Sequence, residues 1–122
     1  LEQEVKGIAT EDFQIYFRAH AMHKLKTKRC YQHCWALPFM VYLDAKGNLW
    51  PCIAFMGKEE LKYGNIHENT FVQIWEGSQR KKVIAYFWNM DLEQNCRELC
   101  RLDEMNRYLE QLKHPGRHVN FI

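Results

Sequence analysis

The stretch CWALPFMVYLDAKGNLWPC, residues 34–52, is typical of a β-hairpin that carries a cysteine at each end. Hydrophobic residues run through a first arm at about 39–44, and a second arm follows at about 48–55. Between the arms, Gly47 can adopt the positive φ that a tight turn often requires. Closing this hairpin could bring the sulfurs of Cys34 and Cys52 to the same end of a small antiparallel sheet.

Helical signals dominate the chain after the hairpin. Asn69 or Thr70 can cap a helix that Gly77 ends, and a second helical stretch covers about 78–88. A later apolar stripe recurs at helical spacing and consists of Leu102, Met105, Tyr108, Leu109 and Leu112. Before the hairpin, alternation over 13–17 predicts a strand. The expected fold class is α+β, a small hairpin or sheet followed by helices, with the cysteines clustering around one metal site.

The composition is that of an ordinary globular chain. Of 122 residues, 47% are hydrophobic and 26% charged, and the formal net charge of +2 gives no strong nucleic-acid signal. No apolar run approaches the roughly 20 residues of a membrane span, and no signal peptide opens the chain, so we expect a cytoplasmic protein without membrane contact. The opening Leu1-Glu2-Gln3 resembles a cut inside a longer protein, which predicts an excised module.

Cysteine chemistry is the main functional signal. Four soft thiolates come from two pairs in distant parts of the chain, Cys34 with Cys52 and Cys96 with Cys100. Cys30 is a fifth cysteine. Cys96 and Cys100 are four residues apart, which on a helix would place them on one face. Four thiolates suit a tetrahedral zinc or a four-iron cluster. Because these cysteines come from dispersed segments of the chain, the four-iron cluster is slightly favoured over zinc: a cubane is wider than one ion.

Three stretches around these cysteines carry a family resemblance. They are LDAKGNLWPC (43–52), YGNIHENTFVQIWEGSQR (63–80) and NCRELCR (95–101). In this order, residues 34–101 resemble SPASM and twitch domains, the C-terminal auxiliary-cluster domains of radical S-adenosylmethionine enzymes. A full SPASM domain carries more cysteines, for two clusters. The single late pair here is similar to the one-cluster, twitch-like variant.

The resemblance implies a ligand set and a cofactor. Cys34, Cys52, Cys96 and Cys100 match the twitch ligand positions and would hold one [4Fe–4S] cluster. Cys30 would be either a substitute ligand or a spare thiol. A cluster held by four cysteines leaves no iron open, which implies electron relay, whereas a missing ligand would let the open iron position substrate.

The resemblance also implies a domain plan. Residues 30–122 would be the auxiliary domain, and 1–29 would be a lead-in or the tail of a catalytic barrel. The Cys-x3-Cys-x2-Cys motif of the radical enzymes is absent: Cys30 and Cys34 have its first spacing, but Leu37 stands where the third cysteine belongs. We therefore expect no catalysis from this chain alone. The implied partners are an upstream barrel, which would bind S-adenosylmethionine, and its substrate, a peptide, sugar or cofactor precursor.

Two other functions compete with this interpretation. The first is a zinc-stabilised structural or interaction module, in which the metal contributes only to folding. The second is a metal-free interaction domain whose helix at 101–113 docks a partner. Neither explains the Gly-Asn-Ile and Ile-Trp-Glu-Gly elements. Arg97 and Arg101 flank the late cysteine pair, where they would offset cluster charge or simply be surface charges.

Overall fold

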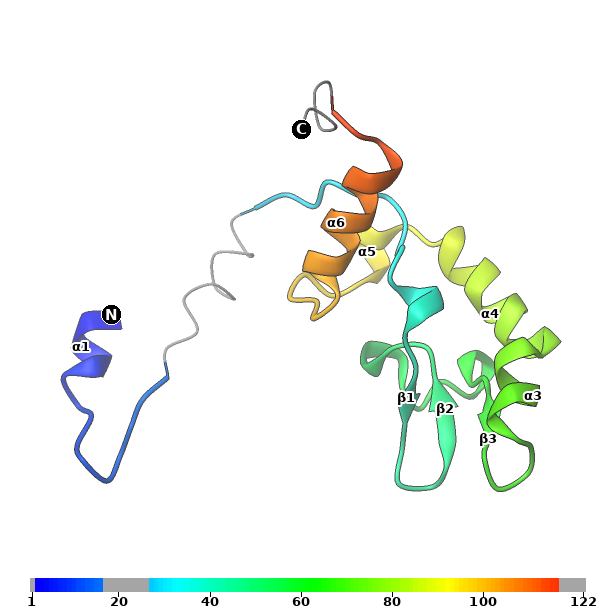
Figure 1. Cartoon of the computed structure of the whole chain (residues 1–122), viewed down its shortest axis with the longest axis horizontal. Coiled ribbons are helices and arrows are strands. Elements are labelled where there is room, and N and C mark those ends of the chain that lie inside the picture. The colour runs from blue at the N-terminus through cyan, green and yellow to red at the C-terminus, as the bar shows by residue number, and fades with distance from the viewer. Residues whose placement is uncertain (1, 17–26, 117–122) are drawn as a thin grey trace, which may run out of the picture.

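The computed structural model describes residues 2–16 and 27–116 (Figure 1). Three short strands form an antiparallel sheet in the order β1-β2-β3: β1 (Tyr42–Leu43), β2 (Asn48–Trp50) and β3 (Gly64–Asn65). The α-helices are α1 (Glu2–Lys6), α3 (Phe71–Glu76), α4 (Ser78–Trp88), α5 (Leu92–Asn95) and α6 (Asp103–Lys113). The predicted α+β class is confirmed. No helix in the described ranges is long and apolar enough to cross a membrane.

The hairpin turn is stabilised by one carboxylate. Asp44 accepts hydrogen bonds from the backbone N–H groups of Lys46 (2.8 Å) and Asn48 (2.9 Å) and from the side chains of Asn48 (2.9 Å) and Trp50 (2.8 Å). Gly47 takes the predicted positive φ, 81°. The Asn48 and Trp50 side-chain bonds are the main cause of an Asp44 pKa well below the usual range of aspartate.

The low pKa of Asp44 predicts an acid-sensitive contribution to stability. Because the folded pKa lies below the unfolded value of about 3.9, this contribution is present above pH 4 and is lost as pH falls through the folded pKa. Asp44→Asn should therefore lower the melting temperature at pH 7. Between pH 5 and 3, the melting temperature of the variant should decrease less than that of wild type. Melting curves of metal-free protein would measure both effects, with the exposed Glu60→Gln as the control. Parallel pH profiles for Asp44→Asn and wild type would contradict the assignment.

The sheet differs from the predicted hairpin in two ways. The arms are shorter, because the chain turns into 3₁₀-helices at Leu37–Phe39 and Ile53–Phe55. Pro38 and Pro51 lie at these ends, and neither has an N–H to extend a ladder. The second difference is β3, a third strand beyond the two arms of the predicted hairpin.

The predicted helices after the sheet are confirmed. Thr70 caps α3 through a capping box: its hydroxyl accepts from the Gln73 N–H (3.3 Å), and the Gln73 side chain accepts from the Thr70 N–H (2.9 Å). Gly77 separates α3 from α4. These helices and the sheet enclose the core, whose buried members are Leu37, Leu49, Cys52, Phe55, Leu61, Tyr63, Ile74, Val83 and Phe87.

Helix α6 turns a polar face toward the body of the protein. Asp103 and Asn106 are 5% and 1% exposed. The Tyr31 hydroxyl and the Arg107 guanidinium each donate to the Asp103 carboxylate at 2.9 Å. Burial, followed by the bond to Asp103, raises the pKa of Tyr31 well above its ordinary value. Polar contacts therefore attach α6 to the segment that precedes β1.

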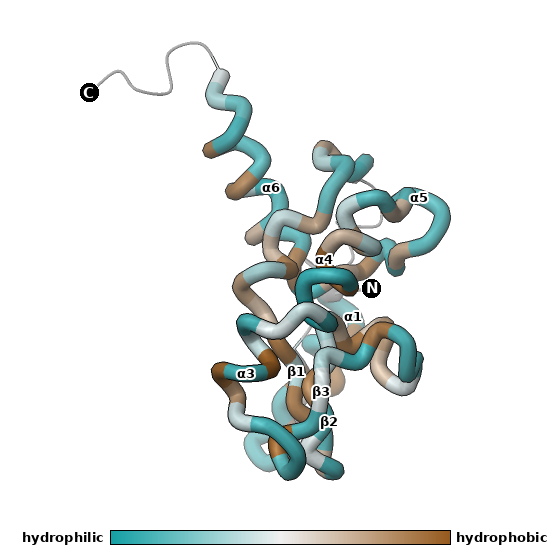
Figure 2. The backbone as a smooth tube through the Cα atoms, turned by 90° about the vertical axis from the view of Figure 1, so that its right-hand side faces the viewer, coloured by the Kyte–Doolittle hydropathy of each residue, from teal (hydrophilic) through white to brown (hydrophobic). Residues whose placement is uncertain are grey.

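The predicted apolar stripe of α6 faces mostly outward. Leu102, just before the helix, is buried, but Met105, Tyr108 and Leu112 are 39%, 60% and 58% exposed. Figure 2 shows hydrophobic positions recurring along the otherwise hydrophilic α6. The periodicity thus predicts the helix correctly but does not identify its buried side.

The predicted strand at 13–17 is wrong over its described part, 13–16, which contains no strand. Thr10 and Phe13 instead exchange two backbone hydrogen bonds, Thr10 N–H to Phe13 O (2.8 Å) and Phe13 N–H to Thr10 O (3.3 Å). The local turn satisfies these groups without a partner strand. Phe17, the last residue of the predicted strand, lies outside the described residues.

Candidate metal centre

Four cysteines lie around one margin of the core. Cys52 follows β2, caps the 3₁₀-helix at Ile53–Phe55 and is buried within the core. Cys34, on the segment that leads into β1, packs against the same core. Cys96 and Cys100 are partly exposed and lie between α5 and α6. In Figure 1 this α5–α6 region stands next to the segment that leads into β1.

The charges on these thiols act on one another. Burial is the largest cause that raises the pKa of Cys34, to about 11, and it also raises the pKa of Cys52 and Cys96. The negative charge of Cys100 adds to the increase at all three. Cys96 acts in addition on Cys34, and Cys52 on Cys96. The fold therefore groups four thiols within electrostatic reach. No three His, Cys, Asp or Glu side chains in the described residues are arranged to hold a single metal ion.

The predicted helical spacing of the late pair is wrong. Helix α5 ends at Asn95, and Cys96 has an extended backbone with φ −117° and ψ 148°. The N–H of Cys100 bonds to the carbonyl of Glu98 at 3.0 Å, and α6 begins only at Asp103. The two cysteines therefore lie on a loop, where their directions are set by turns and not by a helical face.

Each of the four thiols has a backbone N–H close to it in the sequence that bonds to its sulfur or lowers its pKa. The backbone N–H of Leu102 donates to Cys100 Sγ at 3.4 Å. The nearby backbone N–H groups of Leu37, Ala54 and Arg97 lower the pKa of Cys34, Cys52 and Cys96, respectively. The buried Asn106 amide adds a side-chain donor to Cys34 Sγ at 3.6 Å. These contacts favour thiolates, the form that ligates metals.

Two arginines place positive charge near the thiols. Arg97 lowers the pKa of Cys52, and Arg29 lowers that of Cys96. The Arg29 guanidinium donates to the carbonyls of Leu92 and Arg97, the latter at 2.9 Å. Sequence reasoning singled out Arg97 but missed Arg29, because a contact across 68 residues leaves no local signal. The side chain of Arg101, the other flanking arginine, is exposed.

Cys30 has a different environment. It is exposed, and its sulfur accepts a hydrogen bond from Arg107 of α6 at 3.5 Å. Arg107 also forms an ion pair with Asp103 at 2.9 Å and donates to the carbonyl of Lys28. The structure thus places Cys30 against α6, and a ligand role for it stays a prediction.

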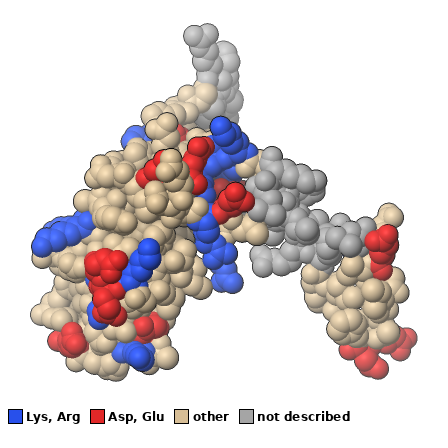
Figure 3. Space-filling model, turned by 180° about the vertical axis from the view of Figure 1, so that it is seen from behind, with Lys and Arg blue, Asp and Glu red and all other residues tan. Residues whose placement is uncertain are grey.

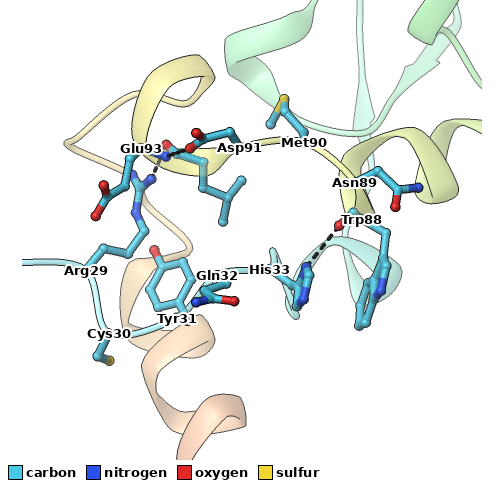
Figure 4. Close-up of a pocket in the computed structure, with 11 residues that line it drawn as sticks. Arg29, Cys30, Tyr31, Gln32, His33, Trp88, Asn89, Met90, Asp91 and Glu93 are labelled. Atoms are coloured by element: carbon cyan, nitrogen blue, oxygen red, sulfur yellow. Dashed lines mark hydrogen bonds between the residues drawn. The ribbon is translucent and has the colours of Figure 1, made fainter.

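An open hollow of about 680 Å³ lies next to this region, between residues 29–33 and 88–93 (Figure 4). His33 stacks on the Trp88 ring at 4.5 Å with an interplanar angle of 1°, and its Nδ1 lies 2.9 Å from the Trp88 carbonyl. Arg29 extends across the hollow to α5. The four grouped thiols are not among its lining residues.

The charged surface shows no single-sign field on the face in Figure 3, where Lys and Arg are interspersed with Asp and Glu. In the basic run at 80–82, the side chain of Arg80 makes contacts within the protein. Its guanidinium lies 3.6 Å from the Trp75 ring centroid and donates to the carbonyls of Trp75 (3.1 Å) and Pro38 (2.7 Å). This arginine therefore stabilises the core margin.

Comparison with known proteins gives one match. A family model described as SPASM, iron-sulfur cluster-binding domain, matches residues 34–102. The matched range starts at Cys34, contains all four grouped thiols and excludes Cys30. No curated protein and no solved structure that was compared matches the chain.

Proposed function

Since the chain belongs to the SPASM family of iron–sulfur cluster-binding domains, we propose that Cys34, Cys52, Cys96 and Cys100 hold one [4Fe–4S] cluster in an auxiliary domain of a radical S-adenosylmethionine enzyme. The observation that carries this proposal is the grouping of four thiols within electrostatic reach of one another, each with a backbone N–H nearby that favours the thiolate or bonds to its sulfur. A cubane needs four soft thiolates, and dispersed segments can supply them around a group wider than one ion.

The residues fit such a group chemically. Mutual repulsion and burial disfavour the thiolates in the free protein, as the raised pKa values of Cys34, Cys52 and Cys96 show. A bound centre containing iron cations would offset this repulsion, so binding stabilises the arrangement that the fold imposes. Arg29 and Arg97 would offset the negative charge that remains.

We propose electron relay as the role of the domain. When bound, a [4Fe–4S] cluster accepts and passes on single electrons. With a cysteine for each iron, no position is left open for substrate. The chain would hold the cluster, exclude water with the core around Cys52, and direct N–H donors at the sulfurs. Hydrogen bonds and limited exposure are the features by which a protein sets a cluster's potential.

We further propose that residues 30–122 form the auxiliary domain and pack against a catalytic barrel that precedes them, with residues 1–29 as the connection. The exposed apolar side chains of Met105, Tyr108 and Leu112 on α6 support such a neighbour, because an adjacent domain would cover them. The substrate would then be selected mainly in the barrel.

Metal and sulfide analysis tests the proposal. Protein purified and reconstituted without oxygen should contain about four irons and four sulfides per chain and show a broad brown absorption. A reversible one-electron reduction should follow in a potentiometric titration. One zinc per chain with no sulfide after reconstitution would instead support the structural module and contradict electron relay.

A further inference from the structure

Tyr63, which precedes β3, has a buried hydroxyl without a partner. The residue is 3% exposed, and its hydroxyl has no hydrogen bond to any described group. Its backbone is well fixed, since the N–H donates to the Leu49 carbonyl of β2 at 2.8 Å. The ring is therefore fixed in the core at one end while its polar end has nothing to bind.

An unpaired buried hydroxyl destabilises a folded protein, because it gives up water and gains no hydrogen bond. Phenylalanine would fill the same volume without this cost. A buried polar group of this kind needs an explanation outside the protein's own hydrogen bonds, such as an ordered water, a bound ion or a redox role. The hydroxyl of Tyr63 therefore indicates an acceptor that the protein part alone does not supply.

The surroundings of Tyr63 point to the cysteine ligands as the place of this acceptor. Tyr63 belongs to the same core cluster as Cys52, and Cys34 packs against that cluster. The pKa of Tyr63 is raised to about 12, mainly by burial; the charge of Arg80 opposes this increase, and the charges of Cys34 and Cys52 add to it. At neutral pH the phenol therefore keeps its proton and is a donor within electrostatic reach of two predicted ligands.

We propose that the Tyr63 hydroxyl donates a hydrogen bond to a sulfur of the bound cluster or of its Cys34 or Cys52 ligand, and so raises the cluster's reduction potential. The inference rests on the proposed function and adds a residue outside the ligand set. The direction of the change in reduction potential follows from charge. Reduction adds an electron to the iron–sulfur unit, so a hydrogen-bond donor stabilises the reduced form more than the oxidised form.

Tyr63→Phe removes only this donor. At an applied potential near the wild-type midpoint, we expect the ratio of reduced to oxidised cluster to fall about tenfold, which corresponds to 59 mV for a one-electron couple. Iron and sulfide content should match wild type. Tyr86→Phe is the matched control, because Tyr86 lies on α4 and is 51% exposed, and its ratio should not change.

A second measurement does not depend on the size of this shift. In deuterated buffer, pulsed electron–nuclear spectroscopy of the reduced cluster should detect an exchangeable deuteron that is lost in Tyr63→Phe and retained in Tyr86→Phe. In the metal-free state, Tyr63→Phe should unfold at the same or a higher urea concentration than wild type, because it removes an unpaired buried group.

The outcomes separate this inference from the proposed function. A wild-type protein that binds no iron and sulfide overturns both. Normal cluster loading, with an unchanged potential and an unchanged deuteron signal in Tyr63→Phe, overturns the role of Tyr63 and leaves the proposed function standing. A variant of Tyr63 that loses the cluster altogether would also contradict a tuning role, because ligation would then depend on the hydroxyl.

Discussion

Cys52→Ala is expected to abolish stable cluster binding. Cys52 is the most buried of the five cysteines and the one that belongs to the core itself, so its replacement removes a sulfur from the closely packed side of the group. Changes to groups behind the ligands typically lower metal affinity 10–100-fold, and loss of a ligand should cost at least as much. Iron per chain after anaerobic reconstitution and desalting would measure it, and we expect less than about a tenth of the wild-type value.

The remaining thiols supply the controls for this prediction. Cys34→Ala, Cys96→Ala and Cys100→Ala should each lose most of the iron as well. Cys30→Ala should keep it, because that thiol is exposed, contacts Arg107 and lies outside the range of the family match. A Cys30 variant that loses iron while the Cys96 variant retains it would make Cys30 the ligand in place of Cys96. Urea unfolding of the metal-free variants would distinguish lost ligation from lost folding.

Local signals predicted the parts of the fold that depend on neighbouring residues. Gly47 takes the positive φ of its turn, and the capping box of Thr70 starts α3. The α+β class and the helix at 78–88 follow from the same kind of evidence. The backbone N–H groups that favour the candidate thiolates also come from residues close by in the sequence.

Contacts between distant residues explain the features that the sequence did not reveal. Periodicity alone favours burial of the apolar side of α6. The structure buries Asp103 and Asn106 instead, because partners 72 and 70 residues away satisfy them. The loop around Cys96 and the contact of Arg29 with α5 likewise depend on the assembled fold. Helical spacing could not predict either of them.

Asn106→Ala is expected to have the second large effect, on the free energy of unfolding. The Asn106 side chain is 1% exposed and joins α6 to the segment before β1. Its Oδ1 accepts from the N–H of Ala36 at 2.8 Å, and its Nδ2 donates to Cys34 Sγ at 3.6 Å. Truncation leaves the fully buried Ala36 N–H without a partner and opens a small cavity. Together these effects should cost about 2–3 kcal/mol, measured by urea denaturation of metal-free protein.

Two further variants separate packing from chemistry at this position. Asn89→Ala removes an exposed asparagine whose side chain bonds to Ala85 at 2.9 Å, and it should change stability by no more than about 0.5 kcal/mol. Asn106→Asp keeps an acceptor for Ala36 but replaces the donor to Cys34 with a negative charge. It should therefore lower iron retention more than its effect on the metal-free protein explains. If the iron retention of Asn106→Asp falls only as far as its loss of stability in the metal-free protein explains, Asn106 acts only by holding α6 in place. The contact with Cys34 Sγ would then contribute nothing to cluster binding.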